Sequence, residues 1–308
     1  MTDPQNHLFC FGYGYSCDYL GHALQQEGGW RISGTTRDPE KQALMRARGI
    51  KSYLFDYQKP LGDPAAFLHG ATHVLISTPP NDDGDPAFTI HANDVLEVPG
   101  VRWVGYLSST SVYGDRAGSI VDESVVPEPS SKRGSRRARA ETLWMSLLES
   151  SCLPVHIFRL AGIYGPGRSA LDSVRAGLAR RVDKPGQAFS RIHVEDIVNV
   201  LLASMHRPRP GAVYNVADDS AAPSHEVIAY ACELLGLPIP PLVPYEEADL
   251  TPMARSFYSD NKRVSNELIK QELGITLKYP DYKAGLRACL ESENHHGAPQ
   301  PFISTGAA

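Results

Sequence analysis

The stretch Leu8-Phe9-Cys10-Phe11-Gly12-Tyr13-Gly14-Tyr15-Ser16-Cys17 decides the fold. A short apolar run ends there in a glycine-rich turn, and a segment with helical spacing follows and stops at Gly28-Gly29. A turn of this kind between a strand and a helix brings backbone amides close to a pyrophosphate. We therefore expect Gly12, Gly14, Tyr15 and Ser16 to bind the phosphates of a dinucleotide. Cys17 stands where such a turn usually has its third glycine.

Runs of strand length alternate with amphipathic segments through the first half of the chain. The predicted strands are 7–11, 31–34, 51–55, 73–77, 102–108 and 154–160, and a helix covers 140–148. This alternation predicts an α/β fold, a Rossmann-type doubly wound parallel sheet with helices on both faces. Later helices are expected at 169–180, 195–206, 224–235, 260–273 and 281–290, with short strands at 188–192 and 213–216.

The change of rhythm after Gly165 indicates two domains. We expect an NADP-binding domain at 1–165 and a smaller mixed α/β substrate-binding domain at 166–292, interleaved with the first. The polar, patternless tail at 293–308 is expected to be disordered.

Composition excludes several classes of protein. Among 308 residues, Lys and Arg number 30 against 35 Asp and Glu, a net charge of −5, which argues against a dedicated nucleic-acid binder. No run approaches the ~20 apolar residues of a membrane span. Five widely spaced cysteines without a Cys-x-x-Cys pair favour a reducing cytoplasm, and no cluster has the spacing of a metal site.

The end of the second predicted strand bears on the choice of dinucleotide. An NAD site would place Asp or Glu here for the ribose 2′-hydroxyl, but the chain reads Thr35-Thr36-Arg37. A guanidinium can bind a 2′-phosphate bidentately, so Arg37 favours NADP, with NAD as the alternative. Asp56 is placed to meet the adenine amino group, although an ordinary turn aspartate has the same pattern. Ser77, Thr78 and Pro79 follow the fourth strand and could line the cofactor's ribose.

Four further motifs resemble those of a known family. They are Ser108-Ser109-Thr110-Ser111-Val112-Tyr113-Gly114, Arg159-Leu160-Ala161-Gly162-Ile163-Tyr164-Gly165-Pro166-Gly167, Arg191-Ile192-His193-Val194-Glu195-Asp196-Ile197 and Tyr214-Asn215-Val216-Ala217. In this order they are similar to the extended short-chain dehydrogenase/reductases, the NAD(P)-dependent epimerase/dehydratase group.

The resemblance implies a Ser or Thr that orients a substrate oxygen, a Tyr that transfers a proton, and a Lys four residues later. Spacing from Val112 maps the Ser position to Ser109, and spacing from Glu141 maps the Tyr and Lys positions to Arg133 and Arg137. A guanidinium does not release its proton near neutral pH, so Arg133 cannot act as the Tyr does. Arg137 can still donate hydrogen bonds to the nicotinamide ribose. This pattern resembles the atypical members of the family, and a solvated basic helix start at 132–139 is the plainer alternative.

Another residue must then transfer the proton if the chain is an enzyme. Tyr113 is a catalytic candidate beside Ser109, and Tyr164 is expected to pack the cofactor pocket. His193 is a further candidate, with a packed structural histidine as the alternative. The leading hypothesis is an NADP(H)-dependent oxidoreductase acting on a small carbonyl or sugar-like substrate. The rival is a non-catalytic NADP(H)-binding sensor or scaffold, and the resemblance leaves room for a homodimer.

Overall fold

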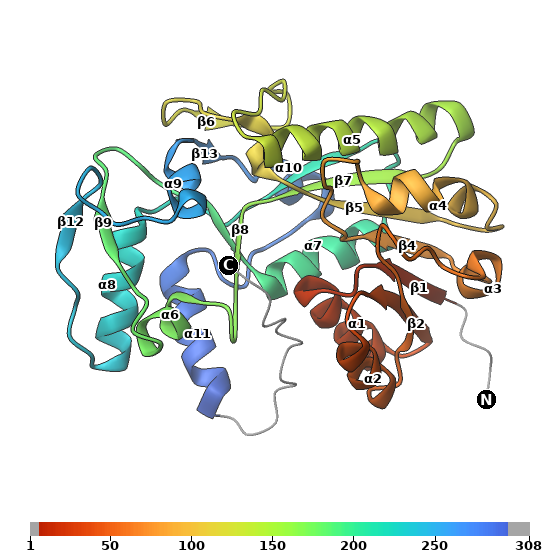
Figure 1. Cartoon of the computed structure of the whole chain (residues 1–308), viewed down its shortest axis with the longest axis horizontal. Coiled ribbons are helices and arrows are strands. Elements are labelled where there is room, and N and C mark those ends of the chain that lie inside the picture. The colour runs from red at the N-terminus through yellow and green to blue at the C-terminus, as the bar shows by residue number, and fades with distance from the viewer. Residues whose placement is uncertain (1–5, 295–308) are drawn as a thin grey trace.

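A parallel sheet of seven strands forms the centre of the molecule. The computed structural model describes residues 6–294, and the sheet order is β11-β7-β5-β4-β1-β2-β3 (Figure 1). The strands are β1 (Asn6–Phe11), β2 (Trp30–Thr36), β3 (Lys51–Leu54), β4 (His73–Ile76), β5 (Trp103–Ser109), β7 (Val155–Leu160) and β11 (Val213–Val216). All neighbouring pairs are parallel. The doubly wound sheet predicted from the sequence is therefore confirmed, and all six strands predicted for the first half belong to it.

Helices cover both faces of this sheet. They are α1 (Tyr15–Glu27), α2 (Pro39–Ala47), α3 (Pro64–Leu68), α4 (Pro86–Leu96), α5 (Lys132–Ser151) and α7 (Val194–His206). Figure 1 shows α4 and α5 on one face and α1 and α7 on the other. Three of the helices start at an Asp-Pro pair, because the Asp side chain caps free amides and Pro suits the first helical turn. The capping residues are Asp38, Asp63 and Asp85.

One buried tryptophan anchors each helical layer. Trp103 of β5 is fully buried toward α7 and donates a hydrogen bond from Nε1 to Ser204 Oγ at 3.0 Å. Trp144 of α5 is fully buried on the opposite face and donates to Asp85 Oδ2 at 3.3 Å. Each ring thus fills a large volume in the core without leaving its N–H unsatisfied.

The remaining elements form a smaller part beside the carboxyl ends of the strands, except α10, which packs on β11 and α7. They are η1 (Thr110–Tyr113), β6 (Ile120–Val121), β8 (Gly162–Tyr164), α6 (Ala170–Arg175), β9 (Arg181–Asp183), β10 (Arg191–His193), α8 (Ser224–Leu235), β12 (Leu242–Pro244), α9 (Pro252–Tyr258), β13 (Arg263–Val264), α10 (Glu267–Leu273) and α11 (Tyr282–Asn294). Three two-stranded pairs, β8 with β10, β9 with β12 and β6 with β13, tie this part together.

Several expectations for the second half differ from the structure. The helix predicted at 169–180 ends at Arg175, because Gly177 follows with a φ of +68° and stops it. The helix predicted at 260–273 begins only at Glu267, because Arg263 and Val264 pair with β6. In the second case strand pairing over a long sequence distance replaces a local helical pattern.

Three elements from beyond Gly165 belong with the central sheet: β11 is one of its strands, and α7 and α10 pack beside it, so the two halves of the chain are interleaved. The first two residues of the tail predicted at 293–308 belong to α11, which continues through Asn294. Its remainder, 295–308, lies outside the described residues. Within 6–294, no helix is both long and apolar enough to cross a membrane.

Asp196 connects α7 to the segment that leads into α11. Its carboxylate is completely buried and accepts hydrogen bonds from the backbone amides of Lys278 at 2.8 Å and Tyr279 at 2.9 Å. Burial raises the pKa of this carboxyl, while the two amides oppose that shift.

We predict that Asp196→Ala lowers the free energy of unfolding by about 3 kcal/mol, because two buried amides lose their acceptor. The measurement is urea denaturation followed by circular dichroism. Glu195→Gln is the control: Glu195 forms an exposed ion pair with Lys278, and its loss should cost less than about 1 kcal/mol. Equal effects of the two variants would contradict this account of Asp196.

Candidate functional site

The glycine-rich turn lies where the sequence predicts it, between β1 and α1. Gly12 has a φ of +82°, and a Cβ at this position would stand 3.0 Å from the backbone nitrogen of Thr78, so a side chain would collide with the next strand end. The backbone N–H of Gly12 donates to Thr35 Oγ1 at 2.8 Å, which fixes the turn against the end of β2. Gly14 caps α1 without a side-chain hydrogen bond, so amides of its first turn stay free to bind an anion.

Cys17 takes the place of the third glycine without disturbing this arrangement. It is fully buried, and its thiol donates to the carbonyl of Gly12 at 3.4 Å. Neighbouring Ser16 is also buried, in the first turn of the helix. The small thiol therefore fits between helix and strand at the position where a glycine was expected.

The strand ends beside this turn can accommodate a dinucleotide. Thr78 lies over Gly12, and its Oγ1 is buried without a hydrogen-bond partner in the protein. A bound ligand with a polar group at this place could supply that partner. Ser77 is half-buried and Pro79 exposed in the same segment. Arg37 is exposed directly after β2 and forms no hydrogen bond or ion pair within residues 6–294, which leaves its guanidinium available. The cradle at Gly12 and the unpartnered threonine hydroxyl fit a bound phosphate and ribose.

Asp56 and Lys41 lie in the segments that follow β3 and β2, respectively. Asp56 follows β3, but its Oδ1 already accepts the backbone amides of Gln58 at 2.8 Å and Lys59 at 2.9 Å, as an ordinary turn aspartate does. The adenine contact predicted for Asp56 is therefore open only to its second oxygen. Lys41 of α2 is half-buried, and burial lowers its pKa while Cys17, Asp18 and Asp38 attract its charge. The sequence analysis missed this cation, because nothing in its spacing marks it.

Ser109 ends β5 at the same edge of the sheet. Its Oγ accepts the backbone amide of Ser111 at 3.2 Å and so caps the short helix η1. Ser111 Oγ is buried there without a hydrogen-bond partner. The first turn of α5 packs directly on this segment: a Cβ at Gly134 would stand 2.5 Å from the carbonyl oxygen of Ser111. The start of α5 and Ser109 are therefore neighbours, as the predicted roles of both require.

Arg137 and Arg133 differ in their surroundings, although both lie in the first two turns of α5. Arg137 is half-buried, and its Nη1 donates to the carbonyl of Leu107 at 2.6 Å and to the Tyr106 hydroxyl at 3.3 Å. It thus lies against β5, two residues before Ser109. Arg133 is exposed and holds its guanidinium 4.6 Å from the centre of the Phe257 ring of α9. Arg137 therefore lies against the end of β5 that carries Ser109, whereas Arg133 lies against α9 of the smaller part.

Tyr113 lies in a buried network rather than at an open site. It is fully buried, donates from its hydroxyl to Asn215 Oδ1 at 2.7 Å and accepts from Arg159 Nη1 at 2.9 Å. Burial raises the pKa of this hydroxyl. Because both contacts are internal, the geometry gives Tyr113 a structural place and speaks against the catalytic role predicted for it.

Tyr164 and His193 likewise pack inside the smaller part. Tyr164 is buried, and its hydroxyl donates to the carbonyl of Asp281 at 3.3 Å beside α11, not to the glycine turn. The cofactor contact predicted for Tyr164 is not supported by this placement. His193 caps α7 by accepting the amide of Glu195, and burial lowers its pKa to about 4. The structure thus agrees with the alternative that His193 is a packed histidine.

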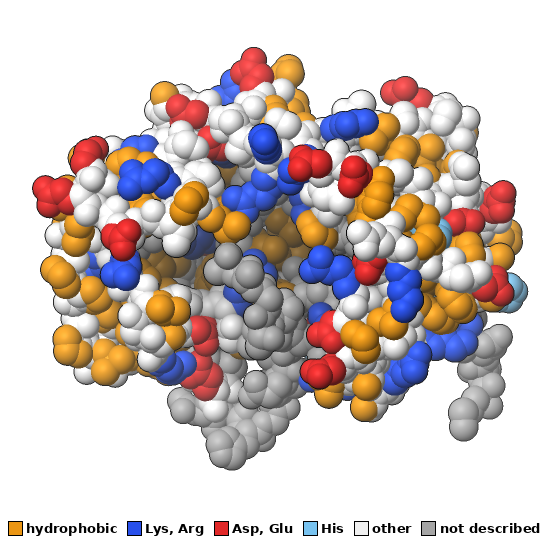
Figure 2. Space-filling model, in the orientation of Figure 1, with side chains coloured by type: hydrophobic (Ala, Val, Ile, Leu, Met, Phe, Trp, Pro, Cys, Tyr) orange, Lys and Arg blue, Asp and Glu red, His pale blue; other side chains and the backbone are white. Residues whose placement is uncertain are grey.

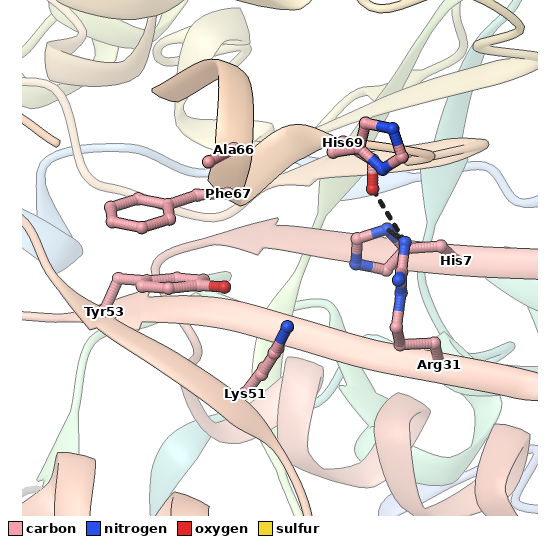
Figure 3. A pocket seen from close by; sticks show the side chains of 7 residues that line it. All are labelled: His7, Arg31, Lys51, Tyr53, Ala66, Phe67 and His69. Atoms are coloured by element: carbon pink, nitrogen blue, oxygen red, sulfur yellow. Dashed lines mark hydrogen bonds between the residues drawn. The ribbon is translucent and has the colours of Figure 1, made fainter. Parts of the chain in front are cut away.

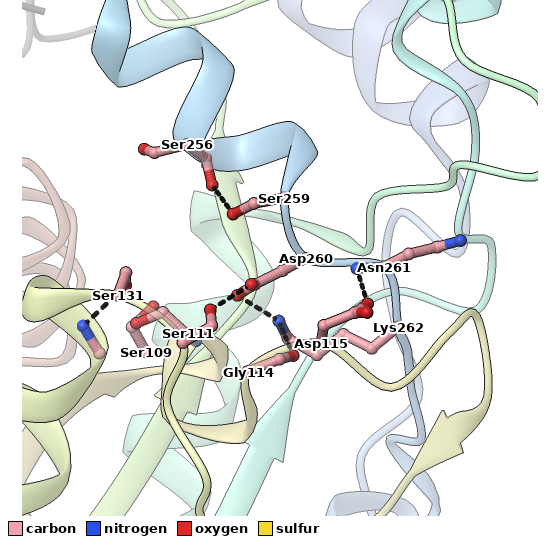
Figure 4. A network of polar contacts seen from close by, with 12 residues as sticks. Ser109, Ser111, Gly114, Asp115, Ser131, Ser256, Ser259, Asp260, Asn261 and Lys262 are labelled. Atoms are coloured by element: carbon pink, nitrogen blue, oxygen red, sulfur yellow. Dashed lines mark hydrogen bonds and ion pairs between the residues drawn. The ribbon is translucent and has the colours of Figure 1, made fainter.

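Tyr15 links the glycine turn to the smaller part. Its hydroxyl donates to the carbonyl of Pro166 at 2.9 Å, across 151 positions of sequence. On the other side of the site, Lys262 donates to the carbonyl of Gly114 at 2.8 Å and pairs with Asp260 at 3.2 Å, while Ser130 donates to Asp260 (Figure 4). These contacts join the smaller part to the strand ends, and Figure 2 shows the molecule hollowed near its centre, with Lys and Arg side chains around the hollow.

Comparisons with known proteins agree with this geometry. No protein-family model matches the chain. A conserved protein of unknown function from Silicibacter pomeroyi is 51% identical, with a TM-score of 0.86 over 93% of this chain and 99% of that one. Protein YeeZ of Escherichia coli is 26% identical over 262 residues, which are 82% of this chain and 89% of YeeZ. UDP-glucuronic acid 4-epimerase from Bacillus cereus, solved with UDP-glucuronic acid and NAD, is 14% identical with a TM-score of 0.76 over 94% of this chain and all of that one.

The chain has the fold of the extended short-chain dehydrogenase/reductases. The resemblance seen in the sequence motifs is thus confirmed for the architecture. Within this fold, the correspondence of Arg133 and Arg137 to the Tyr and Lys of the family stays a prediction from spacing. No group of three or more His, Cys, Asp or Glu side chains in the described part of the chain has the arrangement of a metal site.

Asp218 is a candidate functional group that the sequence analysis missed. It follows β11, is 3% exposed and leaves its Oδ2 without a hydrogen-bond partner. Burial is the main reason that its pKa rises to about 7, and the charge of Arg191 opposes the rise. Nothing in the sequence indicates the burial of Asp218 or its raised pKa, because Asp218-Asp219-Ser220 has the pattern of any polar turn.

The raised pKa of Asp218 makes stability fall with pH. Both folded and unfolded forms are protonated below its ordinary pKa of 3.8, whereas from there to about 7 only the unfolded form loses the proton. We predict that wild type loses about 2.5 kcal/mol more than Asp218→Asn between pH 5 and pH 8. Unfolding by urea at the two pH values measures this. The same pH dependence in both proteins would contradict it.

Proposed function

We propose that the chain is an NADP(H)-dependent oxidoreductase of the epimerase/dehydratase type that acts on a small carbonyl or sugar-like substrate. The observation that carries the proposal is the meeting of three features at one edge of the sheet. The glycine turn offers free amides and a cradle under Thr78, Arg37 offers an unpaired guanidinium, and Arg137 donates to the carbonyl of Leu107, two residues before Ser109 on β5. The fold shared with an epimerase solved with NAD supports the same conclusion.

Each residue has a defined task in this proposal. The amides at the start of α1 would bind the pyrophosphate and Arg37 the 2′-phosphate of the dinucleotide, which supplies hydride chemistry when bound. Ser109 would hold the substrate carbonyl by a hydrogen bond. Arg137 would bind the nicotinamide ribose, and its fixed charge would stabilise negative charge that develops on the carbonyl oxygen. Arg133 has no role as a proton donor in this proposal, because its guanidinium keeps its proton near neutral pH.

The experiment that tests catalysis is stopped-flow fluorescence of bound NADPH with a panel of aldehydes, ketones and nucleotide sugars. Oxidation of NADPH by at least one class, lost in Ser109→Ala while NADPH binding is kept, is the expected result. Tight NADPH binding without turnover of any substrate would contradict an enzyme and favour the second candidate.

That second candidate is a non-catalytic NADP(H)-binding sensor or scaffold. The placement of Arg133 favours it, because this side chain lies over Phe257 at the position where the family has its proton-transferring Tyr. The double variant Arg133→Tyr with Arg137→Lys separates the two candidates. Activity that appears only in the double variant would identify the native chain as a binder.

We predict that Arg37→Ala weakens NADPH binding by about ten- to a hundredfold and leaves NADH binding unchanged, because the guanidinium meets only the 2′-phosphate. Isothermal titration calorimetry with both cofactors measures this preference. Arg139→Ala removes an exposed cation of α5 as a control and should change neither affinity. An unaltered preference in Arg37→Ala would favour NAD as the cofactor.

The proposal includes the cytoplasmic location expected from the cysteines. All five are free, and four of them are buried: Cys10, Cys17, Cys232 and Cys289. The homodimer also stays part of the proposal, and sedimentation analysis tests it.

A further inference from the structure

A second concave site lies at the opposite edge of the sheet from the glycine turn. The pocket has a volume of about 290 Å³ and is lined by His7, Arg31, Lys51, Tyr53, Ala66, Phe67 and His69 (Figure 3). His7, Arg31 and Lys51 stand at or near the starts of β1, β2 and β3, whereas the candidate active site lies at the ends of the strands. The two sites are therefore separated by the length of the sheet.

The strand register places these side chains on one face. His7 pairs with Arg31, and Lys51 pairs with Ser33, two residues farther along β2. Paired residues and residues two apart share a face of the sheet. On this face α3 has only five residues, so it covers little of β2 and β3 and leaves the pocket open.

An aromatic wall closes one side of the pocket. The rings of Tyr53 and Phe67 stack with centroids 4.0 Å apart, which joins β3 to α3. The ring of Phe9 on β1 lies nearly parallel to that of Tyr53, with centroids 6.2 Å apart. Because Tyr53 is already packed against these neighbours, the wall is rigid and gives the pocket a fixed shape.

Arg31 is held in place by its neighbours. Its Nη2 lies 2.8 Å from His7 Nδ1 and donates to the carbonyl of His69 at 2.7 Å. A guanidinium can only donate, so Nδ1 of His7 is the acceptor and Nε2 carries the proton, which it donates to Ser33 Oγ at 2.6 Å. Burial, followed by the charge of Arg31, lowers the pKa of His7 to about 4, so the ring is neutral at physiological pH.

The positive charge of the pocket is not balanced locally. No carboxylate is among its lining residues, and Arg31 Nε is buried without a hydrogen-bond partner. Lys51 is exposed, and its ammonium forms no hydrogen bond or ion pair within residues 6–294. Two cations on a concave wall without a nearby anion create a local positive field, although the whole chain is negative.

We propose that this pocket binds a phosphate group, either free or carried by a small organic molecule. Arg31 offers a preorganised guanidinium and Lys51 a mobile ammonium, a combination suited to a doubly charged oxyanion. The volume equals that of roughly ten water molecules, so it has room for a phosphate and a short organic body but not for a dinucleotide. The proposal is independent of the function assigned to the other edge of the sheet.

The test is calorimetric titration of the full chain with sodium phosphate and with glycerol 3-phosphate. Each titration is made with and without saturating NADPH, because the glycine turn can also attract phosphate, and sodium chloride at equal ionic strength serves as the blank. We expect binding that persists with NADPH and weakens about tenfold or more in Lys51→Glu. Lys59→Glu makes the same charge change in the exposed turn that follows β3 and should bind as wild type does.

Two further measurements keep the result clear. Lys51→Gln removes the charge without reversing it. If Lys51→Glu disturbs the strand, Lys51→Gln should lose less phosphate affinity than Lys51→Glu does. NMR of the histidine rings should show shifts at His69 during the titration. Tighter binding of glycerol 3-phosphate than of inorganic phosphate indicates an organic phosphate, and equal binding indicates the free ion. Binding that is absent, that NADPH abolishes, or that is equal in wild type and both Lys51 variants overturns the proposal.

Discussion

Arg159 of β7 and Glu141 of α5 are 5% and 6% exposed, and their side chains meet in a bidentate ion pair with Nη2 and Oε2 2.8 Å apart. Such a pair is costly to desolvate, and removing one partner usually costs 3–5 kcal/mol, so it fixes the position of the two elements more strongly than apolar contacts alone. Because Arg137 and Arg133 stand four and eight residues before Glu141, they follow the same side of the helix. The ion pair therefore sets where the candidate catalytic positions lie relative to the ends of the strands.

The network around this pair explains which polar side chains are free to act. Ser108 donates to Glu141 at 2.5 Å, and Arg159 continues through the Tyr113 hydroxyl to Asn215 of β11. Buried hydrogen bonds of this kind make the core specific, and the groups that form them are then occupied, although Asn215 Nδ2 at the end of the chain of contacts has no partner. Ser109, one residue beyond Ser108, points the other way along the alternation of the strand and is only half-buried. One residue of register thus separates a structural serine from a candidate catalytic one.

The sequence predicted the sheet well because its strands are continuous apolar runs bounded by turn residues, as buried parallel strands are. It also located the glycine turn, since the position of Gly12 and Gly14 between a strand and a helix is a local property. It was less successful where structure depends on distant pairing: α10 begins only at Glu267, because Arg263 and Val264 pair with β6. For the same reason it could not foresee that Tyr113 would be enclosed by Arg159 and Asn215, or that Asp218 would be buried. Neither a side chain's enclosure nor its missing partner is encoded in nearby residues.

The late position of β11 in the chain has a consequence for synthesis and for truncation. Strand β7 pairs with β5 on one side and with Val213–Val216 on the other. While the chain emerges from the ribosome, β7 therefore keeps a free hydrogen-bonding edge until about fifty further residues have been made. A fragment that ends at Gly165 would retain this open edge permanently, and the amides and carbonyls exposed along it are a template for pairing with other chains. Pairing of β11 with β7 removes this template as soon as β11 has been made, and so limits aggregation of the chain.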